Sequence, residues 1–292
     1  NPDQIAVAHF PEEGLVMSYG SGFGGNAILS KRSFGLRIAS ACTEEKFLVA
    51  HSSIFSLKSP AGDKYYFAGC FPCGTGKTNV SLLVPTIPGW TQRCMSDEIA
   101  WMNVGDDGRM YAINPENGFF GVASGLSYKT NRAMMDSIQN NTIFTNVALT
   151  PEGDVWWEGM TAVPPSKLVD WTGQDWTPDC GRLAAHPNSR FSSPLSTCPI
   201  IDPEWDNPHG VPISAIVFGN KCKSTLPLVW ESFSWVHGVF HGACISLDDY
   251  TARGRPKSAH RDALCMEPFT GGNINTYFHQ WLSYKKFLGF NA

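Results

Sequence analysis

Residues 65–78 read Tyr65-Tyr-Phe-Ala-Gly-Cys-Phe71, followed directly by Pro72-Cys-Gly-Thr-Gly-Lys-Thr78. The aromatic and small apolar residues of the first part predict a buried β-strand. The glycine-rich turn that follows predicts a phosphate loop, in which backbone N–H groups meet phosphate oxygens at the start of a helix. In such a loop Lys77 reaches the β- and γ-phosphates and Thr78 binds the metal ion. The full motif has a further glycine where Phe71 stands, so a chance Gly-Lys-Thr in a loop is the alternative interpretation.

The segments on either side of this stretch predict a mixed α/β fold with much β structure. Helices are expected from Phe34 to Phe47, from Lys77 to a stop at Pro85, and from Trp235 to Ala243. Segments 151–180 and 192–212 are rich in Pro, Gly, Asp and Trp, which is typical of long loops. Further strands are expected at residues 5–10 and 14–19, around the turn at Pro11, and at residues 211–218 and 226–234.

Composition limits the class of protein. With 292 residues, of which 42% are apolar, the chain has the length of one or two ordinary domains and is not disordered as a whole. The net charge of −4 argues against a nucleic-acid partner or an anionic membrane surface, and no apolar run approaches the ~20 residues that span a bilayer. Only 16% of the residues are charged, which is typical either of a chain embedded in an assembly or of an extracellular one.

The cysteines and the first residues bear on the protein's surroundings. Nine cysteines at irregular spacing favour free thiols over a disulfide framework. The first four residues, Asn1-Pro-Asp-Gln4, include neither an initiator Met nor an apolar signal core. We therefore expect a processed, trimmed or partly observed chain.

Longer ordered strings surround the phosphate loop. They include Phe71-Pro-Cys-Gly-Thr-Gly-Lys-Thr-Asn79, Ser96-Asp-Glu-Ile-Ala-Trp-Met102 and Ala185-His-Pro-Asn-Ser-Arg-Phe191, together with residues 20–26, 36–39, 112–123, 141–147, 198–202 and 234–240. Together they resemble the GTP-dependent phosphoenolpyruvate carboxykinases. The resemblance covers nearly the whole chain but only the middle of the family's pattern, since family members carry a further N-terminal lobe and a C-terminal part that holds the guanine base.

The resemblance implies an α/β fold of mixed sheets around a phosphate-loop nucleotide-binding core. Residues 1–46 would be the remnant of an N-terminal substrate lobe. Residues 47–292 would form the carboxykinase-like core, with a substrate-binding insertion around 113–210.

The resemblance also implies a chemistry. In this family GTP phosphorylates the enolate that remains when oxaloacetate loses carbon dioxide, and a manganese ion bridges the phosphoryl group and the enolate oxygen. By position, the nucleotide and its metal would be held by Gly74, Gly76, Lys77, Thr78 and Asp97. The substrate and the transferring phosphoryl group would contact Asn188 and Arg190, and Gly24 and Gly25 would face the substrate. His51 would be a manganese ligand.

The departures from the family's pattern fall on the ligands of the metal. Arg32 stands where the family has a metal-binding lysine, and a guanidinium has no lone pair to offer a metal. Glu98 stands where the family has an aspartate, and its extra methylene shifts the carboxylate outward by roughly one C–C bond. An arginine beside a carboxylate of longer reach predicts an ion pair. We therefore expect an Arg32–Glu98 ion pair in place of the manganese, with His51 packed alongside.

The substrate side departs as well. Cys73 stands where the family has a substrate-binding serine, Phe23 replaces a tyrosine, and residues 220–223 read Asn-Lys-Cys-Lys where the family has paired arginines. Thr75 replaces the cysteine for which the family's loop is known. Cys70 and Cys73 form a Cys-x-x-Cys pair near a helix N-terminus, a setting that lowers the pKa of a thiol. The pair has two interpretations: a reactive thiol pair, or two buried free thiols.

From these changes we expect a divergent carboxykinase-like protein that acts in a structural or binding role without the family's reaction. The alternatives are an active GTP-dependent carboxykinase and a new activity in the old pocket that uses Cys73. No cofactor is assigned; in the active alternative GTP or GDP would bind with Mn²⁺ or Mg²⁺. The expected partners are a small molecule or nucleotide and a protein, with no nucleic acid and no membrane span. The family resemblance suggests a cytoplasmic or mitochondrial location. The sequence itself does not indicate either compartment, and an extracellular location stays open.

Overall fold

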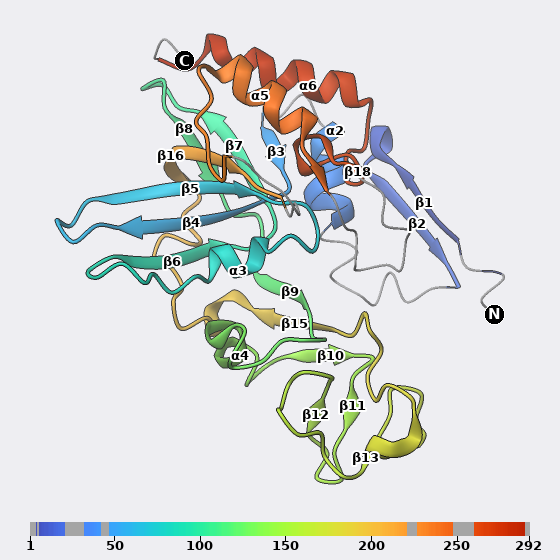
Figure 1. The fold of residues 1–292 in the computed structure, drawn as a ribbon. Helices are drawn as coiled ribbons and strands as arrows, with labels where there is room; N and C mark the ends of the chain where they lie inside the picture. The colour runs from blue at the N-terminus through green and yellow to red at the C-terminus, as the bar shows by residue number, and fades with distance from the viewer. Residues whose placement is uncertain are drawn as a thin grey trace. The chain divides into compact units, whose positions relative to one another are not determined.

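The computed structural model describes residue 4 and residues 6–20, 32–41, 47–220, 227–247 and 260–289, which divide into two compact units. One unit comprises residues 1–116 and 202–292, and the other comprises residues 117–201. The chain is mixed α/β, as its sequence predicts (Figure 1).

The first unit is built on a seven-stranded sheet. In spatial order its strands are β3 (Leu48–Ala50), β7 (Ala100–Val104), β8 (Met110–Ile113), β16 (Val211–Phe218), β5 (Lys64–Cys70), β4 (Ser52–Lys58) and β6 (Thr91–Ser96). Among these described strands, only β5 and β16 pair in parallel, with Cys70 opposite Phe218, while all other neighbours are antiparallel. Because ligands in α/β sheets bind beyond the carboxyl ends of parallel strands, the end of β5 is the expected place for a site.

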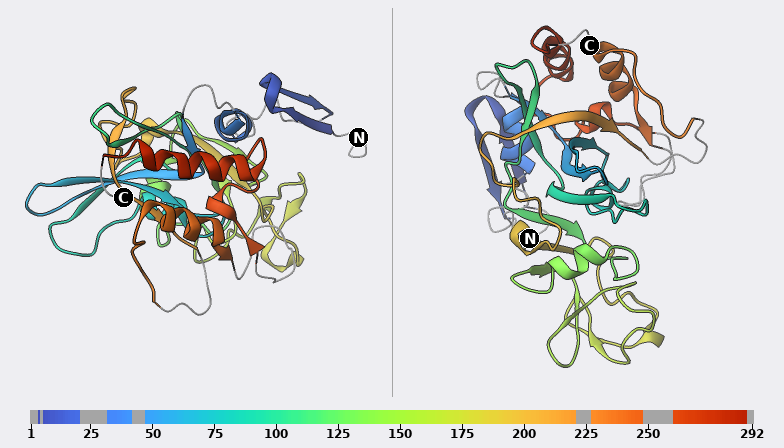
Figure 2. Two further views of the ribbon diagram at one scale, coloured as in Figure 1. Left: turned by 90° about the horizontal axis from the view of Figure 1, so that it is seen from above. Right: turned by 90° about the vertical axis from the view of Figure 1, so that its left-hand side faces the viewer.

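Two helices cover this sheet and supply much of its core. Helices α5 (Trp235–Cys244) and α6 (Ile274–Ser283) lie side by side in the views of Figures 1 and 2. The buried Tyr277 of α6 donates its hydroxyl hydrogen to the carbonyl of Val49, 2.6 Å away, which ties the helix to β3. The indole of Trp281 stacks on that of Trp235, with ring centroids 5.9 Å apart, so each helix buries an aromatic ring against the other.

The first unit also holds smaller elements. They are the hairpin of β1 (Ala6–Phe10) and β2 (Leu15–Tyr19) joined by the 3₁₀ turn η2 (Pro11–Glu13), the helical segment η4 (Ser33–Ile38) with α2 (Ala39–Ala41), α3 (Lys77–Ser81), the pair β17 (Ser246–Leu247) and β18 (His260–Arg261), η9 (Ala263–Cys265) and η10 (Tyr284–Lys286). The hairpin confirms the two strands expected around Pro11. The helix expected from residue 34 is present over residues 33–41, and residues 42–46 lie outside the described part of the chain.

The second unit is built from two small sheets and one helix. One sheet has the order β10 (Ile143–Thr145), β15 (Arg190–Pro194), β9 (Gly118–Val122), and the other has the order β12 (Val155–Trp156), β11 (Ala148–Leu149), β13 (Leu168–Val169), β14 (Asp175–Trp176). The remaining elements are α4 (Arg132–Ser137), η6 (Pro178–Cys180) and η7 (Leu195–Thr197). Trp156 and Trp176 pack together in a small core, with ring centroids 5.9 Å apart.

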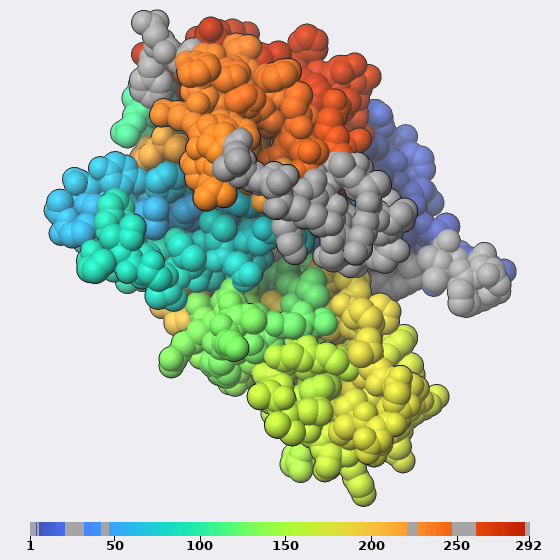
Figure 3. Space-filling model, viewed as in Figure 1, coloured from blue at the N-terminus to red at the C-terminus, as the bar shows by residue number. Residues whose placement is uncertain are grey.

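Two sequence-based expectations are wrong in detail. Residues 227–234, part of the segment coloured orange in Figure 3, form no strand. Pro227 has no N–H to donate to a ladder, and Leu228 and Val229 are 84% and 87% exposed. The composition of segment 151–180 predicts a loop throughout, yet the segment contains β12, β13 and β14. These strands are two residues long, and each buries one side chain, Trp156, Leu168 or Trp176; a composition rich in turn-forming residues does not reveal strands this short.

Candidate functional site

The phosphate loop has the geometry that its sequence predicts. Strand β5 ends at Cys70, and helix α3 begins at Lys77 with Gly76 as its N-cap. Gly74 and Gly76 adopt φ angles of +81° and +107°, which side chains with a Cβ rarely adopt. Between them Thr75 closes a tight turn, donating its backbone N–H and its hydroxyl to the carbonyl of Pro72 at 3.2 and 2.7 Å. The strand–loop–helix order over residues 64–81 is therefore confirmed.

Lysine, threonine and aspartate meet at the base of this loop. The Lys77 ammonium group donates to the backbone carbonyl of Asp97 at 2.8 Å. The Thr78 hydroxyl lies 3.4 Å from a carboxylate oxygen of Asp97, which is 1% exposed and directly follows β6. The structure thus brings together the three side chains that the sequence assigns to the nucleotide and its metal.

The next residue, Glu98, takes part in the ion pair expected from the sequence. Arg32 Nε donates to Glu98 Oε1 at 2.7 Å, and a terminal guanidinium nitrogen lies 2.5 Å from the same oxygen. The Glu98 side chain is 3% exposed and that of Arg32 is 20% exposed, so the pair is largely removed from water. Burial acts to lower the pKa of Arg32, but the interactions with Glu98, together with those with Cys73 and Asp97, outweigh it, and the pKa ends above its usual value.

His51 packs beside the ion pair as a neutral imidazole. Its Nε2 lies 3.8 Å from Glu98 Oε1, and its Nδ1 lies 3.2 Å from the carbonyl of Cys265. Complete burial, followed by the charge of Lys77, lowers the pKa of His51 to about 3. The ring therefore carries no charge at neutral pH.

A residue that the sequence alone does not single out completes this cluster. The ring of Phe269 lies under the Arg32 guanidinium, 5.5 Å from its centre, and its centroid is 4.4 Å from that of His51. A guanidinium held over an aromatic face gains a cation–π attraction. The only signal in the sequence is a faint resemblance over residues 266–269, more than 200 positions from Arg32.

The thiols of the loop are not activated: Cys70 is buried, and Cys73 is half-buried. Burial raises the pKa of Cys70 to about 12, and burial likewise raises the pKa of Cys73 despite the nearby charges of Arg32 and Lys77. Desolvation disfavours a thiolate more than the short helix α3 favours it. The geometry thus supports two free thiols over a reactive pair, of which Cys70 is fully buried.

The remaining predicted residues lie in the second unit or outside the described residues. In the second unit, Arg190 donates from Nε and from a terminal nitrogen to the side-chain oxygen of Asn188 at 3.0 and 2.6 Å, and its guanidinium lies 5.1 Å from the ring centre of Phe120. These contacts hold the arginine in one orientation. Positions 23–25 and 221–223 belong to the residues that the structure does not describe.

Two further features, a membrane-spanning helix and a metal-binding cluster, are absent from the part of the chain that the structure describes. None of the helices there is long and apolar enough to cross a membrane. Among those same residues no group of three or more histidine, cysteine, aspartate or glutamate side chains is arranged to hold a metal ion.

Comparison with known proteins gives the same family as the motifs. Residues 47–289 match the phosphoenolpyruvate carboxykinase C-terminal P-loop domain, and residues 1–44 match the phosphoenolpyruvate carboxykinase N-terminal domain. The chain is 49% identical to the phosphoenolpyruvate carboxykinase [GTP] of Chlamydia muridarum over 286 residues, and 47% identical to that of Anaeromyxobacter sp. (strain K). Each alignment covers 97% of this chain and 48% of the relative, so the chain spans about half the length of these relatives. The chain belongs to the GTP-dependent phosphoenolpyruvate carboxykinase family.

Proposed function

We propose that this chain binds a nucleotide through its phosphates and does not carry out the family's manganese-dependent reaction. It would serve as a nucleotide-binding or structural protein. We also propose the division into a lobe of residues 1–46 and a core of residues 47–292, with a substrate-binding insertion around 113–210. The matched domain descriptions support this division, and so does the compact unit of residues 117–201.

The nucleotide half of this proposal rests on the phosphate loop. Backbone N–H groups between Gly74 and Lys77 and the ammonium group of Lys77 are the donors that a polyphosphate requires. The Thr78 hydroxyl and the Asp97 carboxylate, 3.4 Å apart, are oxygen donors of the kind that Mg²⁺ prefers. These residues fit a magnesium ion delivered with the nucleotide, whose charge would neutralise the phosphate oxygens.

The loss of the reaction rests on one observation, the ion pair of Arg32 and Glu98. By the family resemblance both residues stand at positions of manganese ligands, yet here the guanidinium is bonded to the carboxylate at 2.7 Å. A permanently charged guanidinium repels a divalent cation and has no lone pair for it. His51 alone supplies too few ligands for a tight metal site. The residues present do not fit a manganese ion in addition to the magnesium ion that would arrive with the nucleotide.

An active carboxykinase is the second candidate. Its support is that Lys77, Thr78, Asp97, Asn188 and Arg190 are all retained and that the relatives are named as GTP-dependent enzymes. In this candidate the ion pair of Arg32 would open when manganese and substrate bind.

Two measurements on the purified chain separate the candidates. Calorimetry with GDP and Mg²⁺ should give saturable binding, and Lys77→Ala should weaken it by at least about tenfold, ~1.4 kcal/mol. The assay of GTP- and Mn²⁺-dependent phosphoenolpyruvate formation from oxaloacetate should give no turnover above a blank without protein. Turnover above the blank would overturn the proposed loss, and absence of nucleotide binding would overturn the proposed binding role.

A further inference from the structure

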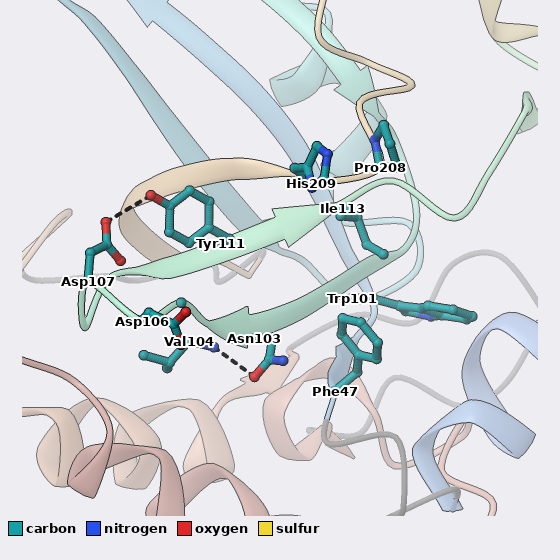
Figure 4. Close-up of a pocket in the computed structure, with 11 residues that line it drawn as sticks. Phe47, Trp101, Asn103, Val104, Asp106, Asp107, Tyr111, Ile113, Pro208 and His209 are labelled. Atoms are coloured by element: carbon teal, nitrogen blue, oxygen red, sulfur yellow. Dashed lines mark hydrogen bonds between the residues drawn. The ribbon is translucent and has the colours of Figure 1, made fainter.

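A cavity in the first unit lies apart from the phosphate loop. It is a groove of about 420 Å³ on the outer face of the β7–β8 hairpin, shown in Figure 4. This volume falls within the range of small-molecule sites, ~300–1,000 Å³. Its floor is made by two cross-strand pairs, Trp101 opposite Ile113 and Asn103 opposite Tyr111.

The pleat of the hairpin explains why this face is aromatic and accessible. The alternate residues Met102, Ala112 and Met110 point into the buried core, so Trp101 and Tyr111 point to the opposite face. Phe47, which directly precedes the edge strand β3, extends this face, with its ring centroid 5.9 Å from that of Trp101. The groove therefore offers several aromatic rings from neighbouring strands.

The charge of the groove is negative. Asp106 and Asp107, both exposed, lie at the hairpin turn at one end, and no lysine or arginine is among the described residues that line the groove. Asp107 is fixed in place, because the Tyr111 hydroxyl and the backbone N–H of Arg109 donate to its two carboxylate oxygens at 2.9 and 3.0 Å. These hydrogen bonds, from Arg109 first and Tyr111 second, lower the pKa of Asp107 and keep it ionised at neutral pH.

We propose that this groove binds an organic cation: a guanidinium, amidinium or ammonium group carried on a flat apolar body. The aromatic rings of Phe47, Trp101 and Tyr111 would stack on the body and attract the cation, and the two carboxylates would pair with it. An anionic ligand such as a nucleotide would be repelled by Asp106 and Asp107. A neutral apolar ligand would gain the stacking contacts but leave the carboxylates without a counter-ion.

The test uses benzamidine as the cationic probe and benzamide as its neutral isostere, with calorimetry at low ionic strength. Benzamidine should bind about tenfold more tightly than benzamide, since only it carries the charge. The double variant D106N/D107N should weaken benzamidine binding by about fivefold and leave benzamide binding unchanged. Trp101→Leu should weaken the binding of both probes, because it removes the stacking surface.

The control is Asp63→Asn, which removes one negative charge where D106N/D107N removes two; it lies at the exposed turn between β4 and β5 and does not line the groove. It should leave the binding of both probes unchanged. The amide introduced by D107N keeps one oxygen to accept from the backbone N–H of Arg109, and its NH₂ can donate to the Tyr111 hydroxyl. The hairpin should therefore keep its fold, which circular dichroism and thermal melting would verify. Equal binding of benzamidine and benzamide, no binding of benzamidine, or an unchanged affinity in a folded D106N/D107N variant would each overturn the proposal.

Discussion

Replacing Glu98 by glutamine should destabilise the protein by about 3 kcal/mol. The substitution keeps the size of the side chain but leaves the Arg32 guanidinium without the carboxylate that it bonds at 2.7 Å. Breaking a buried ion pair from one side costs about 3–5 kcal/mol, because the remaining charge stays out of water. Since one fifth of the Arg32 side chain is exposed, we expect a value at the lower end of that range.

The measurement is a double-mutant cycle with Arg32→Met, Glu98→Gln and the combination of both, followed by urea unfolding and tryptophan fluorescence. If the two side chains stabilise each other, the double variant should be more stable than the sum of the single effects predicts, by about 1.5–3 kcal/mol. The exposed pair of Arg132 and Asp136, 3.8 Å apart, provides the control, and Asp136→Asn should change stability by less than about 0.5 kcal/mol. A coupling energy between Arg32 and Glu98 below about 0.5 kcal/mol would show that the pair does not stabilise the fold.

Three further predictions concern the loop, the buried imidazole and one turn. Lys77→Ala should weaken nucleotide binding in calorimetry while the matched surface change Lys58→Ala leaves it intact, and equal losses would contradict the assignment of the phosphate loop. The pKa of His51 is about 3 in the folded protein and about 6.5 in the unfolded chain, so between pH 7 and pH 5 only the unfolded state takes up a proton at this residue. The free energy of unfolding should therefore fall by about 2 kcal/mol over this range. Urea titrations should show that His51→Gln removes this dependence on pH. Gly210→Ala should lower the melting temperature more than Gly153→Ala. Both glycines have a positive φ, but only at Gly210 would the new Cβ lie 2.6 Å from a carbonyl oxygen, that of Ala112. Equal losses of stability would count against steric strain at Gly210.

Local signals in the sequence are sufficient to predict the phosphate loop. An apolar strand, two glycines with positive φ and a helix starting at Lys77 follow one another along the chain, and each has a composition that predicts it. The ion pair of Arg32 and Glu98 can also be predicted, but only because the family resemblance assigns both residues to one site.

Tertiary context decides what the sequence cannot predict. Phe269 reaches the site from far along the chain, and no local pattern marks a ring that will lie under a guanidinium. The pKa values of Cys70 and Cys73 depend on burial, which outweighs the helix terminus that the sequence suggests. Helix α6 is absent from the sequence-based expectations, although its apolar residues recur at helical spacing, at positions 274, 277, 278, 281 and 282.

An ion pair in the place of the family's manganese ion is the feature on which the proposed loss of the reaction depends. The most direct test is calorimetric titration of the nucleotide-free protein with Mn²⁺, compared with the variant R32K/E98D, which restores the family's lysine and aspartate. We predict no saturable Mn²⁺ binding by the unmodified protein and measurable binding by the double variant, stronger than by either single variant. Tight Mn²⁺ binding by the unmodified protein, with an affinity unchanged in R32K/E98D, would show that the ion pair has not replaced the metal.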